Sequence, residues 1–277
     1  RNNRLLKHAT PLAEMLIDFS QINRSAIVLA DAKGTVLHCC GNQLFLAKIS
    51  RLPLGPGINW SEPSRGTNAI GTCLVTEQLA TVHGDEHFIH SYDFLTGSST
   101  PLHDPRGDIV GAIAVFGEKD TFSAQVLSLL KFSAKMIQNH WLKCESPQLL
   151  RIHFHDQPDW IGTPAEGLIS VDHSGRVHGC NQAAQEILAA TAVSLRKLSI
   201  NDLFDRSTES LLDHFSSSQA PPLLLQSKDA RQPYAVARFF ESEWRHQSPR
   251  HEAPASIAQS PPLATETRKS TRYAGDF

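Results

Sequence analysis

The stretch TPLHDPRGDIVGAIAVFG, residues 100–117, decides the fold of the first half of the chain. It places a short turn, Asp104 to Gly107, between two runs of strand-forming residues. So tight a turn can join only antiparallel neighbours. The same pattern of strand, D-x-x-G and strand recurs at residues 26–37 and 168–178. The sequence therefore predicts antiparallel sheets.

Segments with helical spacing flank these strands. Apolar residues recur at intervals of three and four in residues 5–19 and 123–142, and Pro147 ends the second of these helices. Residues 181–190 and 195–204 predict two shorter helices. We therefore expect an α+β protein with two domains, each an antiparallel sheet flanked by helices.

The chain of 277 residues divides by composition into four segments. After residue 204 only residues 222–226 and 234–240 have strand character, so the second domain is short of sheet material. The last segment is rich in Ser, Pro, Thr and Ala, which bury too little apolar surface to order a chain, and we expect it to be disordered. The expected boundaries are a first domain at 5–142, a linker at 143–154, a second domain at 155–240 and a tail at 241–277.

Charge and cysteine content limit the classes of function. The formal net charge of −2 provides no attraction for nucleic acid, and we expect no direct contact with it. The five cysteines lack the CxxC spacing of zinc or redox sites and suggest reduced thiols in the cytoplasm. No apolar run approaches the roughly 18 residues that a membrane-spanning helix requires.

Two stretches match catalytic or binding motifs only formally. HGDEH at residues 83–87 fits H-x-x-E-H, but a strand precedes it and Gly84 interrupts it, so we expect no metal site there. GTNAIGT at residues 66–72 has P-loop glycine spacing without the lysine, so we expect neither nucleotide hydrolysis nor a cofactor. It predicts a small-residue helix instead, in which Asn68 and Thr72 either bond a ligand or cap and pack.

The sequence holds no nucleophile motif that would support catalysis. G-x-S-x-G is absent, and no cysteine stands beside a histidine with an orienting acid, so we expect a protein that is not an enzyme. The histidines and aromatic residues of 83–94 suit a pocket lining, although packing beneath a loop would use the same residues.

The order and spacing of several motifs carry a family resemblance. WSE at residues 60–62, then GTNAIGT, VHGDEHF at 82–88 and the stretch 100–117, resemble the GAF sensory domain of sigma-54-dependent activators of the acetoin-catabolism and dihydroxyacetone-operon type. Residues 166–188 are similar to the opening of a PAS domain, in which Asn181 has a structural role. Relatives carry a tryptophan and a cysteine shortly before the proline, where this chain has Leu95 and Gly97, so we expect its pocket to accept a different effector or none.

The resemblance implies a homodimeric sensory fragment of a bacterial transcriptional activator. An acetoin- or dihydroxyacetone-like effector, or a regulatory partner protein, would bind the first domain, and the second would relay the signal. In that family an AAA+ ATPase and a helix-turn-helix follow, and this sequence contains neither, so we expect the output to lie elsewhere. The effector-binding residues implied are Trp60, Asn68, Thr72, His83, His87, Phe88, Phe94 and Ser99.

Two alternatives stay open from the sequence. Some GAF domains reduce methionine sulfoxide with paired thiols, which here would require Cys39 or Cys40 to fold close to Cys73. A purely structural interaction module, which dimerises through its helices and has an empty, collapsed pocket, is the other alternative.

Overall fold

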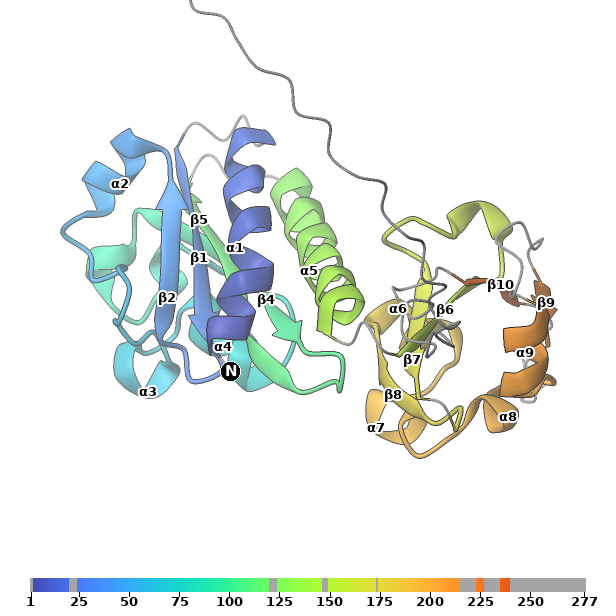
Figure 1. Cartoon of the computed structure of the whole chain (residues 1–277). Coiled ribbons are helices and arrows are strands. Elements are labelled where there is room, and N and C mark those ends of the chain that lie inside the picture. Colours follow the sequence, from blue (N-terminus) through green and yellow to red (C-terminus); the bar gives the residue numbers. More distant parts are fainter. Residues whose placement is uncertain are drawn as a thin grey trace, which may run out of the picture. The chain divides into compact units, whose positions relative to one another are not determined.

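The computed structural model describes residues 2–19, 24–119, 124–145, 149–172, 174–214, 223–226 and 235–239. Two five-stranded antiparallel sheets lie in this part of the chain, with helices packed against them (Figure 1). The predicted α+β class is confirmed. The expected tail at 241–277 lies outside the described residues. Among the described helices, none combines the length and apolarity needed to cross a bilayer.

The first sheet has the strand order β2-β1-β5-β4-β3. Its two central strands come from distant parts of the sequence, and their register pairs Leu29 with Ile113. The long hairpin predicted from residues 100–117 forms β4 and β5. The strands are β1 Ser25–Asp31, β2 Val36–Gly41, β3 Ala80–His83, β4 Leu95–His103 and β5 Ile109–Glu118.

The three D-x-x-G turns share one hydrogen-bonded geometry. In the β4–β5 turn, Oδ1 of Asp104 accepts from the backbone N–H groups of Arg106 (2.9 Å) and Asp108 (3.0 Å). Gly107 has φ of +88°, a left-handed conformation that favours glycine. Asp31 and Asp172 accept the equivalent pairs of bonds in their own turns. The local side-chain chemistry therefore forms each hairpin, as the sequence predicted.

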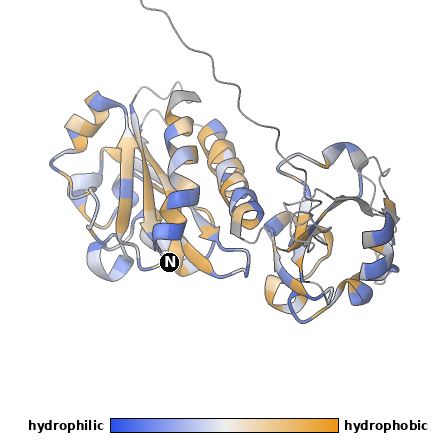
Figure 2. Cartoon of the chain, in the orientation of Figure 1, coloured by the Kyte–Doolittle hydropathy of each residue, from blue (hydrophilic) through white to orange (hydrophobic). Residues whose placement is uncertain are grey.

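Helices cover both faces of the first sheet, which explains why its central strands are apolar throughout. Ile27 and Leu29 of β1 pack with α1 and α5, whereas Val28 packs in a second cluster with α2 and α4. The strands are largely hydrophobic in Figure 2, and α1 and α5 carry both hydrophobic and hydrophilic residues. The helices are α1 Asn2–Phe19, α2 Gln43–Ile49, α3 Glu62–Arg65, α4 Ala69–Thr76 and α5 Ala124–Glu145, with 3-10 turns η1 Gly84–Glu86 and η2 His90–Tyr92.

The second sheet has the order β8-β7-β6-β10-β9. Its strand β6 begins at Leu150, inside the segment that the sequence analysis assigned to a linker. Ile152 and Phe154 are fully buried, and the polar residues between them conceal the strand in the sequence. The elements are β6 Leu150–His155, β7 Gly167–Val171, β8 Val177–Cys180, β9 Leu223–Leu225, β10 Ala235–Phe239, α6 Gln182–Ile187, α7 Ala192–Leu195, α8 Ile200–Leu203, α9 Thr208–His214 and the 3-10 turn η4 Pro158–Trp160.

Buried histidines make the stability of the chain dependent on pH. Burial lowers the pKa of His8, His87, His103 and His153, because it disfavours the charged imidazolium. The unfolded chain regains the ordinary histidine pKa of about 6.5, so below that pH it binds more protons than the folded chain. We expect the free energy of unfolding to fall between about pH 7.5 and about pH 5.5, measured by urea unfolding followed by circular dichroism.

Two variants test this assignment. His103→Gln is expected to reduce the loss of stability on acidification, because it removes a half-buried imidazole whose pKa burial lowers. His90→Ala is the matched control, since the His90 side chain is 96% exposed and its replacement should leave the loss unchanged. Equal or greater stability of the unsubstituted chain at the lower pH would contradict the prediction.

Candidate functional site

An aromatic cluster fills the space beneath the segment from residue 60 to residue 92. The ring of Trp60 is fully buried and stacks on Tyr92 at 5.2 Å, with Phe116 of β5 at 5.4 Å between ring centroids. The indole N–H donates to the carbonyl of Pro53 at 2.6 Å. Trp60 thus anchors the loop between α2 and α3 on the sheet.

Gly97 makes room for this cluster. A Cβ atom placed on Gly97 would lie 2.6 Å from Cε1 of Phe116, closer than real contacts allow. Leu95, two residues earlier on β4, is fully buried in the same cluster. At the two positions where the family resemblance leads us to expect cysteine and tryptophan, this chain therefore packs around Phe116, which gives the site a different lining.

Asn68 caps helix α4 and joins it to the Trp60 loop. Its Oδ1 accepts from the N–H of Gly71 at 2.9 Å, and its Nδ2 donates to the carbonyls of Trp60 (2.9 Å) and Gly66 (2.8 Å). Thr72, one turn later, donates from Oγ1 to Oε1 of Glu62 at 2.6 Å. Both side chains thus make the capping and packing bonds that the sequence analysis set beside ligand binding.

The ring of His87 is buried, and only one of its two nitrogens has a hydrogen-bond partner among the described residues. Its Nδ1 lies 2.9 Å from the carbonyl oxygen of Gly84, which can only accept, so Nδ1 carries the hydrogen and Nε2 is left as an acceptor. Among the described residues, this Nε2 is buried without a hydrogen-bond partner. Burial lowers the pKa of His87, so the ring is neutral. Its ring meets Tyr92 edge to face at 6.1 Å.

His83 differs from His87 although only four residues separate them. It is exposed at the end of β3, its backbone N–H donates to Oε2 of Glu86 at 2.7 Å, and its Nδ1 lies 3.4 Å from Oγ1 of Thr96. The residues between the two histidines form the 3-10 turn η1 rather than an α-helix. The H-x-x-E-H spacing therefore does not place both rings on one helical face.

The remaining predicted residues lie around this cluster at different depths. Phe88 is 74% exposed, packs over Gly66 and donates its backbone N–H to Thr67. Phe94 is half-buried, with the ammonium of Lys48 5.5 Å from its ring centroid. Ser99 is fully buried on β4 and donates to the carbonyl of Ile113 at 3.3 Å. Tyr92 therefore contacts both Trp60 and His87. Asn68 bonds the carbonyls of Trp60 and Gly66, and Phe88 packs over Gly66. Ser99 lies apart from these contacts, within the sheet.

Four of the five thiols, those of Cys39, Cys40, Cys73 and Cys180, are poorly suited to nucleophilic chemistry. Burial raises the pKa of Cys73, Cys39 and Cys40 to about 11 each, and that of Cys180 to about 12. Cys39 and Cys40 lie on β2, at the edge of the sheet opposite β3, whereas Cys73 lies on α4, which packs against β3, β4 and β5. The arrangement does not pair Cys73 with the thiols that a reductase would need.

Helix α5 is tied to the second sheet by three side chains in its last turns. Oε1 of Gln138 accepts from the N–H of Gln182 at 2.9 Å, and Oδ1 of Asn139 accepts from Nδ2 of Asn181 at 2.8 Å. Nζ of Lys143 donates to the buried carboxylate of Glu166 at 3.0 Å. These bonds run directly from the helix that covers the first sheet to the second sheet.

Glu166 is a functional candidate that the sequence reasoning missed. Its carboxylate is almost completely buried and also accepts from His153 at 2.9 Å and from the N–H of Gly162 at 2.7 Å. Burial alone would raise its pKa, but the His153 hydrogen bond and the neighbouring donors hold the pKa below its usual range. Its only signal in the sequence is an acidic residue directly before the apolar strand β7.

Comparison with known proteins agrees with this architecture. The family description "GAF domain" matches residues 5–140. The chain is 26% identical to a signal-transduction and transcriptional-control protein of Clostridium beijerinckii, over 77% of this chain and 32% of the relative. It is 28% identical to the acetoin catabolism regulatory protein of Cupriavidus necator, over 67% and 29%.

A third relative is the PTS-dependent dihydroxyacetone kinase operon regulatory protein of Escherichia coli, 24% identical over 64% of this chain and 28% of the relative. The chain thus spans less than a third of the length of each of these three relatives. All three are named as regulatory or transcriptional-control proteins. Residues 5–140 form a GAF domain, and the chain is homologous to regulators of the acetoin and dihydroxyacetone operon type.

Proposed function

We propose that the GAF domain senses a small hydroxyketone, of the acetoin or dihydroxyacetone class, through His87. The observation that carries this proposal is the buried Nε2 of His87, a lone-pair acceptor that has no partner among the described residues. A buried acceptor left unpaired costs about 1–3 kcal/mol, which a hydroxyl donor from a ligand would recover. The names of two relatives refer to acetoin and dihydroxyacetone, which supports this ligand class.

The surroundings of His87 suit a small, uncharged ligand. The neutral imidazole offers a hydrogen-bond acceptor without a net charge, and Tyr92 and Trp60 provide apolar surface beside it. Small-molecule sites combine such apolar walls with a few fixed polar groups. A hydroxyketone supplies the complementary pair, a hydroxyl donor on a short carbon chain.

The proposal includes a relay through helix α5 to a PAS-like second domain. Gln138, Asn139 and Lys143 bond the second sheet from the last turns of the helix that packs on the GAF sheet. A shift of α5 would therefore reach the second domain, for which we keep the expected boundaries of 155–240. Met15 on α1 and Phe132 on α5 expose apolar surface, which supports pairing of two copies along these helices.

The output of this relay is transcriptional in our proposal. We place this chain in a sigma-54-dependent activator, in which it acts as sensor and not as enzyme. The names of two relatives as regulatory proteins support a regulatory role. The raised thiol pKa values support the non-enzymatic assignment, because a protonated thiol is a poor nucleophile. Exposed Phe88 offers a contact for a regulatory partner protein, the other form of input.

Calorimetric titration with acetoin and with dihydroxyacetone tests the ligand. We expect saturable binding to the unsubstituted chain and a loss of at least about tenfold in affinity for His87→Phe, because phenylalanine fills the same space without an acceptor. His83→Ala is the matched control, since His83 is exposed on the same stretch. Circular dichroism confirms that each variant is folded.

The results distinguish binding of a metabolite at His87 from binding of a partner protein at Phe88. Loss of metabolite binding in His87→Phe, with Phe88→Ala unaffected, would support the hydroxyketone pocket. Binding of a purified candidate regulatory protein that is weakened by Phe88→Ala and not by His87→Phe would support the partner surface instead. Absence of binding by both metabolites, or undiminished binding of either one to His87→Phe, would overturn the assignment of His87.

A further inference from the structure

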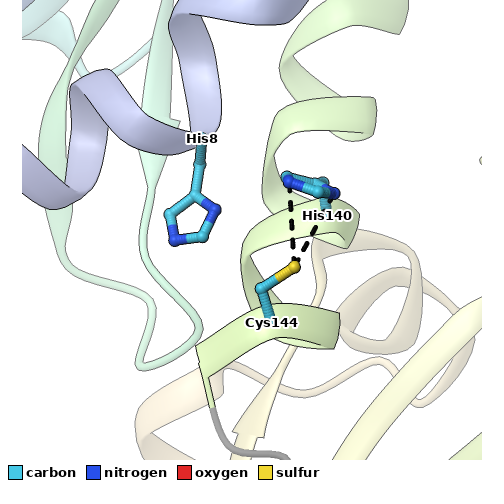
Figure 3. A group of neighbouring side chains, drawn as sticks. All are labelled: His8, His140 and Cys144. Carbon is cyan, nitrogen blue, oxygen red and sulfur yellow. Dashed lines mark hydrogen bonds between the residues drawn. The ribbon is translucent and has the colours of Figure 1, made fainter. Parts of the chain in front are cut away.

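Three potential metal ligands converge between helices α1 and α5, far from the residues that the sequence analysis singled out. His8 comes from α1, and His140 and Cys144 come from successive turns of α5 (Figure 3). One ligand atom from each lies within 4.8 Å of the other two. Sγ of Cys144 is 3.7 Å from Nε2 and 3.9 Å from Nδ1 of His140. Residues four apart share one face of a helix, which explains how α5 presents both.

His8 is buried and incompletely bonded at this place. Its side chain is packed between Trp141, stacked at 5.1 Å, and His140, whose ring centroid is 5.4 Å away, and the residue is only 5% exposed. Within the described part of the chain, its Nδ1 has no hydrogen-bond partner. An unpaired buried nitrogen costs free energy that a bound group would recover. The unpaired Nδ1 of His8 therefore points to a ligand.

The protonation state of His8 suits metal binding. Burial, and then the nearby His140, Lys7 and Arg4, lower the pKa of His8, so the ring is neutral and keeps a lone pair. The positive charges of Lys7 and Arg4 oppose a bound cation. A thiolate at Cys144 would offset them, and a soft sulfur ligand with two imidazoles favours Zn²⁺ over Mg²⁺ or Ca²⁺.

We propose that His8, His140 and Cys144 bind one Zn²⁺ ion, with water as the fourth ligand. Binding would displace the thiol proton of Cys144 to solvent and form one Zn–S bond of about 2.3 Å and two Zn–N bonds of about 2.1 Å, with no electron transfer. Cys144 and His140 are exposed, so the ion has an open path of access.

The position of the site gives the ion a regulatory role. Zinc would fasten the first half of α1 to the last turn of α5, directly beside Lys143 and one turn beyond Asn139. Those two residues bond Glu166, directly before β7, and Asn181, the N-cap of α6. Metal binding would therefore restrain the same end of α5 that contacts the second sheet, through residues that are separate from the His87 site.

Titration with cobalt chloride and then zinc chloride, under reducing conditions, tests the proposal. We expect one equivalent of Co²⁺ to produce a thiolate charge-transfer band in the near ultraviolet together with visible bands of tetrahedral cobalt, and Zn²⁺ to abolish both. Cys144→Ser should remove the charge-transfer band, and His140→Ala should weaken binding at least about tenfold. Both substitutions are at exposed positions and should leave the fold intact.

Two control variants make the assignment specific. Cys40→Ser removes another incompletely buried thiol of the same domain, and His90→Ala removes an exposed histidine; both should bind cobalt as the unsubstituted chain does. As a second readout, Zn²⁺ should raise the melting temperature of the unsubstituted chain and not that of Cys144→Ser. A cobalt spectrum unchanged by Cys144→Ser, or absence of a thiolate band in the unsubstituted chain, would overturn the site.

Discussion

Trp60→Ala is expected to lower the free energy of unfolding of the GAF domain by about 3–5 kcal/mol. The substitution removes a fully buried indole, its stack on Tyr92 and its contact with Phe116, and leaves a cavity in the interior. It also leaves the carbonyl of Pro53 without the indole N–H that it accepts at 2.6 Å. Urea unfolding followed by circular dichroism measures the change, since this signal does not depend on the fluorescence of the replaced residue.

Trp160→Ala provides the matched control for size and chemistry. Trp160 is 47% exposed and stacks on His155 at 5.8 Å, so its removal opens no interior cavity. We expect Trp160→Ala to lower the free energy of unfolding by less than about 1 kcal/mol. Similar losses for the two tryptophans would show that Trp60 does not anchor the loop between α2 and α3.

Asn181→Ala is expected to lower the free energy of unfolding of the second domain by about 3 kcal/mol or more. The buried amide uses its full bonding capacity there. It accepts from the N–H groups of Leu168 (2.9 Å) and Ala184 (2.8 Å) and donates to Asn139 and to the carbonyl of Glu166, both at 2.8 Å. Alanine would leave these buried groups unpaired. Urea unfolding of the variant measures the effect.

The neighbouring residue and the bonding partner of Asn181 supply the controls. Gln182→Ala changes an exposed side chain in the same turn and is expected to cost less than about 0.5 kcal/mol. A double-mutant cycle with Asn139→Ala should give a coupling energy of about 0.5–3 kcal/mol. A coupling energy near zero would show that the Asn139–Asn181 bond does not join α5 to the second sheet.

The parts of the fold that the sequence predicted correctly are those set by neighbouring residues. An aspartate and a glycine three positions later determine each hairpin turn, and Asp104 with Gly107 shows the mechanism, because both the accepting oxygen and the left-handed residue lie within the turn. Apolar spacing located α1 and α5 for the same reason. In contrast, β6 was concealed because burial of His153 depends on a distant partner, Glu166.

The candidate site depended more strongly on tertiary structure. The sequence predicted both His87 and His83 as effector-binding residues. Nothing in the neighbouring sequence shows that His87 is buried and His83 is exposed. The cluster of His8, His140 and Cys144 brings together residues more than 130 positions apart in the chain. The four-residue spacing of His140 and Cys144 was a signal that the sequence analysis did not use.

The amide contacts at the end of α5 also determine what kind of message this helix can carry. The hydrogen bonds that Gln138 and Asn139 accept are directional, so they tolerate little rotation before they break together. Turning an α-helix by a single residue moves its side chains by about 100°, which would replace both amides by other side chains at the second sheet. Intermediate angles of α5 would satisfy neither set of contacts. In the relay that we propose, α5 would therefore change position in one step, and a ligand would change the proportion of molecules in each position instead of bending the helix gradually.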